Sequence, residues 1–253
     1  MNDLRTATGT GGFPDADWLP GLQKAYAGQG APQVTVLGRT VVLPPPGPLV
    51  TGEVAGVAAL VDLRTVERER EIVRQARSRQ DTVDAIIRTV QEEQEVSRAA
   101  VFKLEDVASY ALRLIEPLIF TLKAHFNRAR PWHCDPLLSR MFPKGHAMYP
   151  GHPSYPSGHS TQAHTVAGLF ARRAPHLEKP LLDVAARIAL NREIAGLHFP
   201  SDSAAGRFLG VAFADAIVDA APAAIPAHQF QDWMDFKRDY DALLGLITGS
   251  PAH

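Results

Sequence analysis

Cysteine is almost absent from this chain of 253 residues. Its single cysteine, Cys134, excludes a disulfide bond within the chain and favours a reducing compartment. A strong charge of one sign is also lacking, because 26 basic and 27 acidic residues leave a formal net charge of −1. This balance excludes a general electrostatic affinity for nucleic acid or for an anionic membrane, so that any site for an anion must be local.

Long uninterrupted apolar runs are missing as well. The most apolar long window, residues 108–122, contains Arg113, Glu116 and Pro117, which a helix inside a bilayer would not tolerate. The first ten residues hold no apolar core of the kind found in signal peptides. We therefore expect no transmembrane segment and a cytoplasmic location.

The composition that is present is typical of a globular protein with a real core, since 45% of the residues are hydrophobic and 21% are charged. The length favours one large domain. Residues 1–52 are rich in glycine and proline and are predicted to form an irregular extension, in which residues 34–43 fit a small hairpin with a two-residue turn at Gly38-Arg39. Residues 53–253 are predicted to form the helical catalytic domain.

The helical domain is predicted from apolar residues that recur at a spacing of three or four. One such run begins near Glu53 and includes residues 60–73, and a second begins at Asp81. A third run, residues 107–122, is apolar on so many sides that it is expected at the centre of a bundle, with Pro117 as a point where it could kink. Further helical patterns cover residues 160–173, 177–196, 203–220 and 228–246. Because no series of strands accompanies them, the fold class predicted is all-α, a single helical bundle.

A long loop interrupts the helical patterns between residues 131 and 156, where six prolines and two glycines are found. Long connections of this kind in compact domains tend to be functional, so the loop is a candidate wall of a site. It ends in Pro156-Ser157-Gly158-His159, directly before a helical pattern. The first amides of a helix bind anions, and here they are accompanied by a hydroxyl, a glycine and an imidazole.

Basic residues and a histidine-aspartate pair flank this loop in the sequence. Lys123 and Arg130 are seven residues apart, close to two helical turns, and together suit a tetrahedral oxyanion. Arg192 and His198 can meet at one site only if their helix ends or bends near Gly196. Asp202 follows His198 by four residues and can accept a hydrogen bond from the far nitrogen of the imidazole.

Three motifs in this order resemble the signature of the superfamily that unites type 2 phosphatidic acid phosphatases (PAP2) and vanadium haloperoxidases. They are Lys-x6-Arg-Pro at 123–131, Pro-Ser-Gly-His at 156–159 and Arg-x5-His-x3-Asp at 192–202. The resemblance covers roughly residues 123–202 and implies the helical bundle of the acid phosphatase and haloperoxidase type. Asn191 departs from the pattern, which usually has serine before the arginine.

The resemblance also implies a role for each motif residue. A tetrahedral anion is expected among Lys123, Arg130, Ser157, the Gly158 amide and Arg192. In a phosphatase, His198 attacks phosphorus, Asp202 orients His198, and His159 protonates the leaving oxygen and then activates water. This route needs no cofactor and acts on a small phosphorylated substrate.

In a vanadium haloperoxidase the same residues hold vanadate, with His198 bonded to vanadium as the one metal ligand and with peroxide and halide as substrates. His152, seven residues before His159, is similar to a histidine near the vanadate of bromoperoxidases and is a candidate modulator of the site. The chain length resembles the single-bundle acid phosphatases, which are normally exported. Phosphatase activity is the leading prediction, haloperoxidase activity is the alternative, and oxyanion binding without turnover is a third. The amphipathic run from Phe230 could dock on the bundle or on another subunit, so a homo-oligomer is also open.

Overall fold

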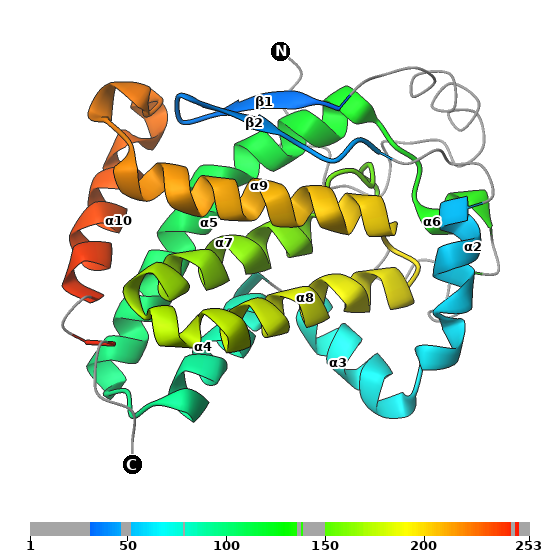
Figure 1. The fold of residues 1–253 in the computed structure, drawn as a ribbon, viewed down its shortest axis with the longest axis horizontal. Coiled ribbons are helices and arrows are strands. Elements are labelled where there is room, and N and C mark those ends of the chain that lie inside the picture. The colour runs from blue at the N-terminus through cyan, green and yellow to red at the C-terminus, as the bar shows by residue number, and fades with distance from the viewer. Residues whose placement is uncertain are drawn as a thin grey trace.

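A computed structural model describes residues 31–46, 52–77, 79–135, 138, 150–243 and 246–247 of the protein, and these residues are mostly helical (Figure 1). This confirms the predicted all-α fold class. The long helices are α2 (Gly52–Ala59), α3 (Val66–Arg77), α4 (Arg79–Glu93), α5 (Arg98–Phe126), α7 (Gly158–Arg173), α8 (Glu178–Ile194), α9 (Pro200–Asp219) and α10 (Phe230–Ala242). The four-residue α6 (Pro131–Cys134) and short 3-10 turns η2 (Val61–Leu63), η4 (Pro175–Leu177), η5 (Pro222–Ala224) and η6 (Ala227–Gln229) connect them.

The predicted hairpin is present as the antiparallel strands β1 (Gln33–Val36) and β2 (Arg39–Val42), which contact α9. Its turn lies one residue earlier than predicted, at Leu37 and Gly38, whose φ angles are 46° and 85°. A two-residue hairpin turn needs positive φ at both central positions, and glycine in the second of them satisfies this. The rest of the predicted extension, residues 1–30 and 47–51, lies outside the described residues, so the domain boundary at residue 52 stays a prediction.

The prediction of one continuous helical run from Glu53 to residue 73 is wrong. It is divided into α2 and α3, with residues 60–65 between them forming η2 and a short connection. Thr65 explains the division, because its hydroxyl accepts a hydrogen bond from the amide of Arg68 at 3.2 Å and so caps a new helix. The run predicted from residue 107 begins earlier, at Arg98, after the Ser97 cap, and α5 continues through Pro117 to the left-handed Asn127.

Helix α7 occupies the centre of the bundle and carries the loop-to-helix motif at its first residues. Ser160–Ala167 are buried around the whole circumference of the helix, which packs against α8 and α9 and, behind them, α4 and α5 (Figure 1). Helix α10 buries Trp233, Phe236 and Tyr240 and packs on α5, so the terminal run docks on its own bundle. None of the helices in the described ranges has the length and apolar character needed to cross a bilayer.

Two glycines one turn apart let α9 approach α7 closely. A Cβ atom on Gly206 would lie 2.7 Å from the carbonyl oxygen of Ser157, and one on Gly210 would lie 2.5 Å from that of Thr161. Both distances are far shorter than van der Waals contact, so the backbones can pack this closely only without side chains here. The close contact places the beginning of α7 directly against α9.

Substitution of Gly210 by alanine tests this contact. We expect Gly210→Ala to lower the free energy of unfolding by about 1–3 kcal/mol, because the added methyl group forces two buried backbones apart. Denaturant titration measures the change. The control is Gly56→Ala in α2, where a Cβ atom meets nothing within 4 Å; its stability should be unchanged or raised by up to about 1 kcal/mol. Equal stability of Gly210→Ala and wild type would contradict the role of the contact.

Candidate active site

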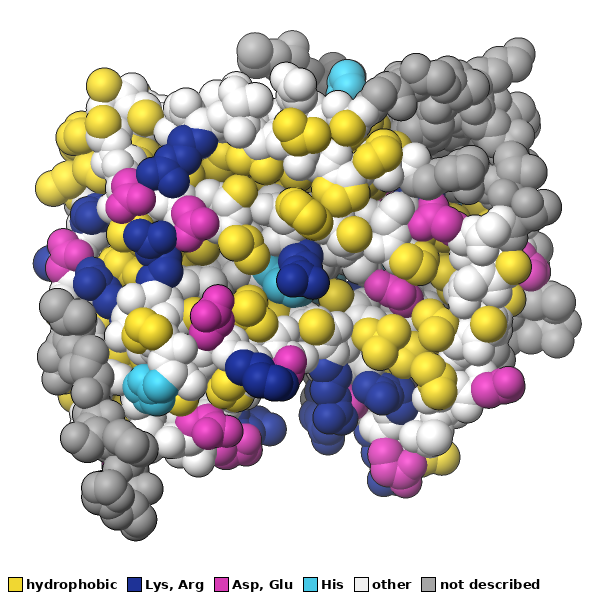
Figure 2. Space-filling model, in the orientation of Figure 1, with side chains coloured by type: hydrophobic (Ala, Val, Ile, Leu, Met, Phe, Trp, Pro, Cys, Tyr) yellow, Lys and Arg dark blue, Asp and Glu magenta, His cyan; other side chains and the backbone are white. Residues whose placement is uncertain are grey.

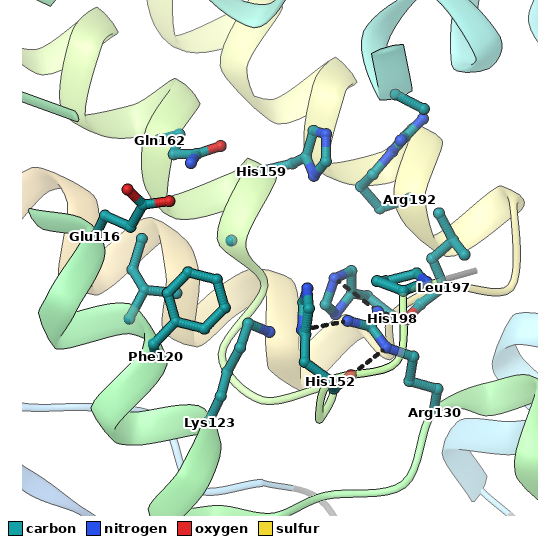
Figure 3. Close-up of a pocket in the computed structure, with 14 residues that line it drawn as sticks. Glu116, Phe120, Lys123, Arg130, His152, His159, Gln162, Arg192, Leu197 and His198 are labelled. Atoms are coloured by element: carbon teal, nitrogen blue, oxygen red, sulfur yellow. Dashed lines mark hydrogen bonds between the residues drawn. The ribbon is translucent and has the colours of Figure 1, made fainter. Parts of the chain in front are cut away.

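A cavity of about 220 Å³ lies where α5, the residues before α7, the first turn of α7 and the end of α8 meet (Figure 3). Residues from all three sequence motifs line it. The predicted site residues on its wall are Lys123, Arg130, His152, Gly158, His159, Arg192 and His198. Ser157 and Asp202 are buried behind this wall. In Figure 3, His159 and Arg192 lie across the cavity from His198, His152 and Arg130.

The turn after α8 brings His198 back to the helix that carries Arg192. Helix α8 ends at Ile194, and Gly196 adopts a φ angle of 72°, which confirms the predicted helix end near this glycine. A Cβ atom here would be strained by that φ angle and would also lie 2.8 Å from the carbonyl oxygen of Leu138. The amide of Leu197 then donates to the carbonyl of Arg192 at 2.9 Å, which closes the turn.

Asp202 holds the Nδ1 side of His198. The two side chains approach within 3.4 Å between Nδ1 and Oδ2, and the hydroxyl of Ser154 donates to the same carboxylate oxygen. The amide of Phe199 also donates to Oδ2, at 2.9 Å. Burial alone would raise the pKa of Asp202, but the charge of Arg128 and the hydrogen bonds from His198 and Ser154 hold it well below its ordinary value. The carboxylate is therefore ionised at any physiological pH.

Arg128 is a site residue that the sequence analysis missed. Its guanidinium is fully buried and forms ion pairs with Asp202 and with Glu53 of α2, and it stacks on the ring of Phe199 at 4.4 Å. It also donates to the hydroxyl of Ser201 at 2.7 Å. The signal available in the sequence was a second arginine two residues before Arg130, at one of the unspecified positions of the Lys-x6-Arg-Pro motif. That signal could not distinguish a solvated arginine from one that supports a buried carboxylate.

Arg130 connects two of the histidines that line the cavity, His152 and His198. Its Nη1 donates to the carbonyl of Leu197 at 2.7 Å and lies 3.2 Å from Nε2 of His198, while its Nη2 lies 3.0 Å from Nδ1 of His152. A guanidinium can only donate, so Nε2 of His198 must be the acceptor and Nδ1 must carry the proton that faces Asp202. Burial, followed by the charge of Arg130, lowers the pKa of His198 well below its ordinary value. His198 is thus neutral, with a lone pair on Nε2.

Lys123 contacts main-chain carbonyl oxygens, whereas the family resemblance implied a contact with the anion. Its buried ammonium group donates to the carbonyl oxygens of Pro153, Ser154 and Pro156, at 2.9, 3.0 and 2.7 Å. These three contacts use all the N–H groups that an ammonium has. Lys123 therefore holds the segment that carries Ser154 and leads into α7, and it contributes positive charge to the cavity that it lines.

The first turn of α7 presents Gly158 and His159 to the cavity, whereas Ser157 caps the helix. The Ser157 hydroxyl accepts from the amide of Ser160 at 3.4 Å, and its own amide donates to the main-chain carbonyl of Asp202 at 3.0 Å. His159 Nε2 lies 3.1 Å from the carbonyl oxygen of Gln75, so Nε2 carries the proton. Burial, assisted by the charge of Arg192, lowers the pKa of His159 to about 3.

Arg192 has donors that no described residue uses. Its Nη2 donates to the carbonyl of Ile72 at 2.9 Å, but Nε and Nη1 are buried and find no hydrogen-bond partner within the described ranges. Unpaired buried donors cost free energy, and an oxyanion in the cavity would satisfy them. Burial lowers the pKa of Arg192 to about 10, which leaves it charged at neutral pH. The arrangement suits a small tetrahedral anion.

Asn191, the departure from the family pattern, ties α8 to α3. Its side-chain amide donates to Oε1 of Gln75 at 2.9 Å and accepts from Arg68 at 3.0 Å. Gln75 is the residue whose main-chain carbonyl contacts His159. A longer amide in place of serine therefore reaches a helix that helps to position His159. Among the described residues, no group of three or more His, Cys, Asp or Glu side chains is arranged to hold a metal ion.

The lowered pKa of the partly buried His159 predicts a pH-dependent stability. Between its ordinary value of 6.5 and its folded value of about 3, His159 binds a proton in the unfolded chain that it does not bind when folded. Protonation therefore stabilises the unfolded chain, and the free energy of unfolding should fall as the pH is lowered below about 6.5, by up to about 1.4 kcal/mol per pH unit for this group. Urea titration at pH 7 and pH 5 should show a smaller loss in His159→Gln than in wild type. An equal loss would contradict the assignment, and replacement of the exposed His228 is the matched control.

The comparison with protein families agrees with the geometry. The model of the PAP2 superfamily matches residues 107–225, which include all three motifs, the whole of α7 to α9 and the cavity-lining part of α5. No curated protein matches the chain. The family match and the convergence of its motif residues on one cavity lead to the same conclusion: residues 107–225 of this protein belong to the PAP2 superfamily.

Proposed function

We propose that this protein is a phosphatase that hydrolyses small phosphate esters through a phosphohistidine at His198. Membership of the PAP2 superfamily supports a phosphoesterase function in general. The finer proposal depends on two groups that line the same cavity. Arg192 has two N–H donors without partners among the described residues, and the neutral His198 has a lone pair on Nε2. A phosphoryl group in this cavity could accept hydrogen bonds from Arg192 and be attacked by Nε2 of His198.

The first half of the reaction transfers the phosphoryl group to the enzyme. Nε2 of His198 forms a bond to phosphorus as the bond from phosphorus to the ester oxygen breaks, and the N–H of Nδ1 remains directed to Asp202, whose charge stabilises the imidazolium that develops. Arg130 and Arg192 stabilise the negative charge on the phosphoryl oxygens. The leaving oxygen takes a proton from His159 and departs as the alcohol.

The low pKa of His159 keeps its side chain neutral, and a bound phosphate ester would allow it to act as an acid. The negative charges of the ester favour the imidazolium form and raise the pKa of His159 from its value of about 3. In the second half, neutral His159 accepts a proton from water as the water oxygen attacks phosphorus. The bond from phosphorus to Nε2 then breaks, and inorganic phosphate and free His198 are restored.

Vanadate suits the same cavity, since it is also a tetrahedral oxyanion: the unused donors of Arg192 and Nε2 of His198 would hold it, and Arg130 would add positive charge. When bound, it would supply the peroxide-activating chemistry of the haloperoxidase alternative. His152, which contacts Arg130 on the cavity wall, is the feature that points to halide oxidation. The family match supports a phosphoesterase function in general, so hydrolysis is the proposed activity. A cytoplasmic location and a homo-oligomeric state stay predictions.

The central prediction concerns the two histidines that face each other across the cavity. We expect His198→Ala to lower phosphate release from p-nitrophenyl phosphate by more than about a thousandfold, because the covalent step is lost. His159→Ala should lower it by about 10²- to 10⁴-fold, because only proton transfer is lost. Vanadate should still raise the melting temperature of His159→Ala.

Exposed His228 provides the control, and His228→Ala should retain wild-type turnover. Unchanged phosphate release by His198→Ala would reject the phosphohistidine. Bromide-dependent halogenation by the vanadate-loaded protein, without hydrolysis of any ester, would instead support the haloperoxidase alternative. If both activities are missing while vanadate still stabilises the protein, the protein binds oxyanions without turnover.

A further inference from the structure

The last turns of α3 support two residues of the site, although α3 contains none of the three motifs. His159 Nε2 donates to the main-chain carbonyl of Gln75 at 3.1 Å, and Arg192 Nη2 donates to that of Ile72 at 2.9 Å. Because α3 ends at Arg77, Gln75 is among its last four residues, whose carbonyls have no partner within the helix. His159 supplies such a partner, so the position of α3 determines where the imidazole lies.

The contact with α3 also decides which nitrogen of His159 can act on a substrate. A carbonyl oxygen only accepts, so Nε2 keeps its proton and Nδ1 is the nitrogen left to exchange one with the ester. The carboxyl end of a helix is negative, which favours the imidazolium form that an acid must reach. The Gln75 carbonyl therefore orients the ring and stabilises its charged state.

Asn191 of α8 holds this end of α3 through side-chain hydrogen bonds. Arg68 donates to Oδ1 of Asn191 at 3.0 Å, and Nδ2 of Asn191 donates to Oε1 of Gln75 at 2.9 Å. Nε2 of Gln75 donates in turn to Glu71 at 3.2 Å, and Glu71 forms an ion pair with Arg187 of α8. Asn191 and Gln75 are both buried. The amide of Gln75 thus lies at the centre of a network that joins α3 to α8.

Charged groups at both ends fix the direction of the hydrogen bonds in this network. A guanidinium can only donate, so the oxygen of the Asn191 amide must face Arg68 and its nitrogen must face Gln75. At the other end, burial would raise the pKa of Glu71, but the hydrogen bonds and charge of Arg187 lower it overall, so the carboxylate is ionised and can only accept. A buried network whose members are all paired in one orientation is rigid.

Position 191 is where the chain departs from the family pattern, which usually has serine. A serine side chain is one bond shorter and has a single polar atom. The asparagine amide presents an acceptor to Arg68 and a donor to Gln75 on separate atoms. The family pattern therefore does not include the contact that holds α3 here.

Resting on the phosphatase function proposed above, the geometry points to Asn191 and Gln75 as positioning residues for proton transfer by His159. The hydrogen bond between their side chains holds the carbonyl to which His159 donates, and so directs Nδ1 to the oxygen of the leaving group. Neither Asn191 nor Gln75 lines the cavity. Both act on the departure of the alcohol through His159 and take no part in binding the ester.

Two esters that differ in their need for an acid test this role. p-Nitrophenolate is a stable anion and leaves without a proton, whereas the alcohol of propyl phosphate must be protonated as it leaves. We expect Asn191→Ala to lower kcat/KM for propyl phosphate about tenfold or more and to leave that for p-nitrophenyl phosphate within about threefold. Since kcat/KM covers the steps up to loss of the alcohol, hydrolysis of the phosphohistidine does not enter the comparison.

Gln75→Met is the second variant, because it removes the side-chain amide and keeps both the side-chain length and the main-chain carbonyl. It should repeat the pattern of Asn191→Ala, and the double variant should lose little more than either single one, because both remove the same hydrogen bond. The control is Gln94→Ala, which removes another buried amide, one that donates to the carbonyl of Ile247 at 3.0 Å. It should leave the ratio of the two kcat/KM values at the wild-type level.

The outcomes separate the positioning role from the function on which it rests. If kcat/KM for p-nitrophenyl phosphate falls as much as that for propyl phosphate in Asn191→Ala, the positioning role is overturned, because a displaced Arg192 would weaken binding of either ester. Unchanged values for both esters, or the same shift in Gln94→Ala, would overturn it as well. Wild-type protein that hydrolyses neither ester would instead overturn the phosphatase function, and the positioning role with it.

Discussion

The buried carboxylate of Asp202 is the point on which the site depends, because it joins all three sequence motifs. Arg128 from the first motif forms an ion pair with it, Ser154 from the segment before the second donates to it, and His198 from the third faces it. The Ser157 amide donates to its main-chain carbonyl. A buried charge without partners would cost several kcal/mol. These contacts offset that cost, and the same contacts position His198.

The other buried basic side chains differ in how many of their N–H groups have hydrogen-bond partners. Lys123 has carbonyl partners for its three N–H groups, and Arg130 donates to main-chain carbonyls and contacts two histidines. Arg192 alone among these three retains buried donors that no described residue satisfies. Buried donors without partners cost free energy, and in folded proteins they are found where a ligand can supply the missing acceptors. Burial, together with the positive charge of the arginines, also lowers the pKa of His159 and of His198.

Close helix packing makes this arrangement possible. The glycines of α9 bring its backbone against the first turns of α7, so that Ser157 and Asp202 can share a hydrogen bond. Helix α3 covers the other side, where the carbonyls of Ile72 and Gln75 receive Arg192 and His159. Asn191 connects α3 to α8 by two further hydrogen bonds. Arg192 and His159 are therefore supported by main-chain atoms of a helix that the motifs do not include.

The sequence by itself determined the helical fold class, most helix positions and the group of residues around the cavity. Apolar periodicity is local, and Gly196 ends α8 through a φ angle that glycine adopts most readily, so both could be predicted from neighbouring residues. Thr65 shows the limit of this reasoning, since one hydroxyl capping a helix divides an otherwise continuous apolar pattern into α2 and α3.

Tertiary structure alone decided which partners the charged side chains have. Whether Arg128 is solvated or paired depends on Glu53 and Asp202, which lie about 75 residues away on either side. Whether Lys123 contacts the anion or the loop depends on where the carbonyls of residues 153–156 point. Arg68 donates to Asn191 only because α3 packs against α8. Hydrogen bonds and ion pairs act over a few ångströms in space, and the number of residues between two side chains does not predict that distance.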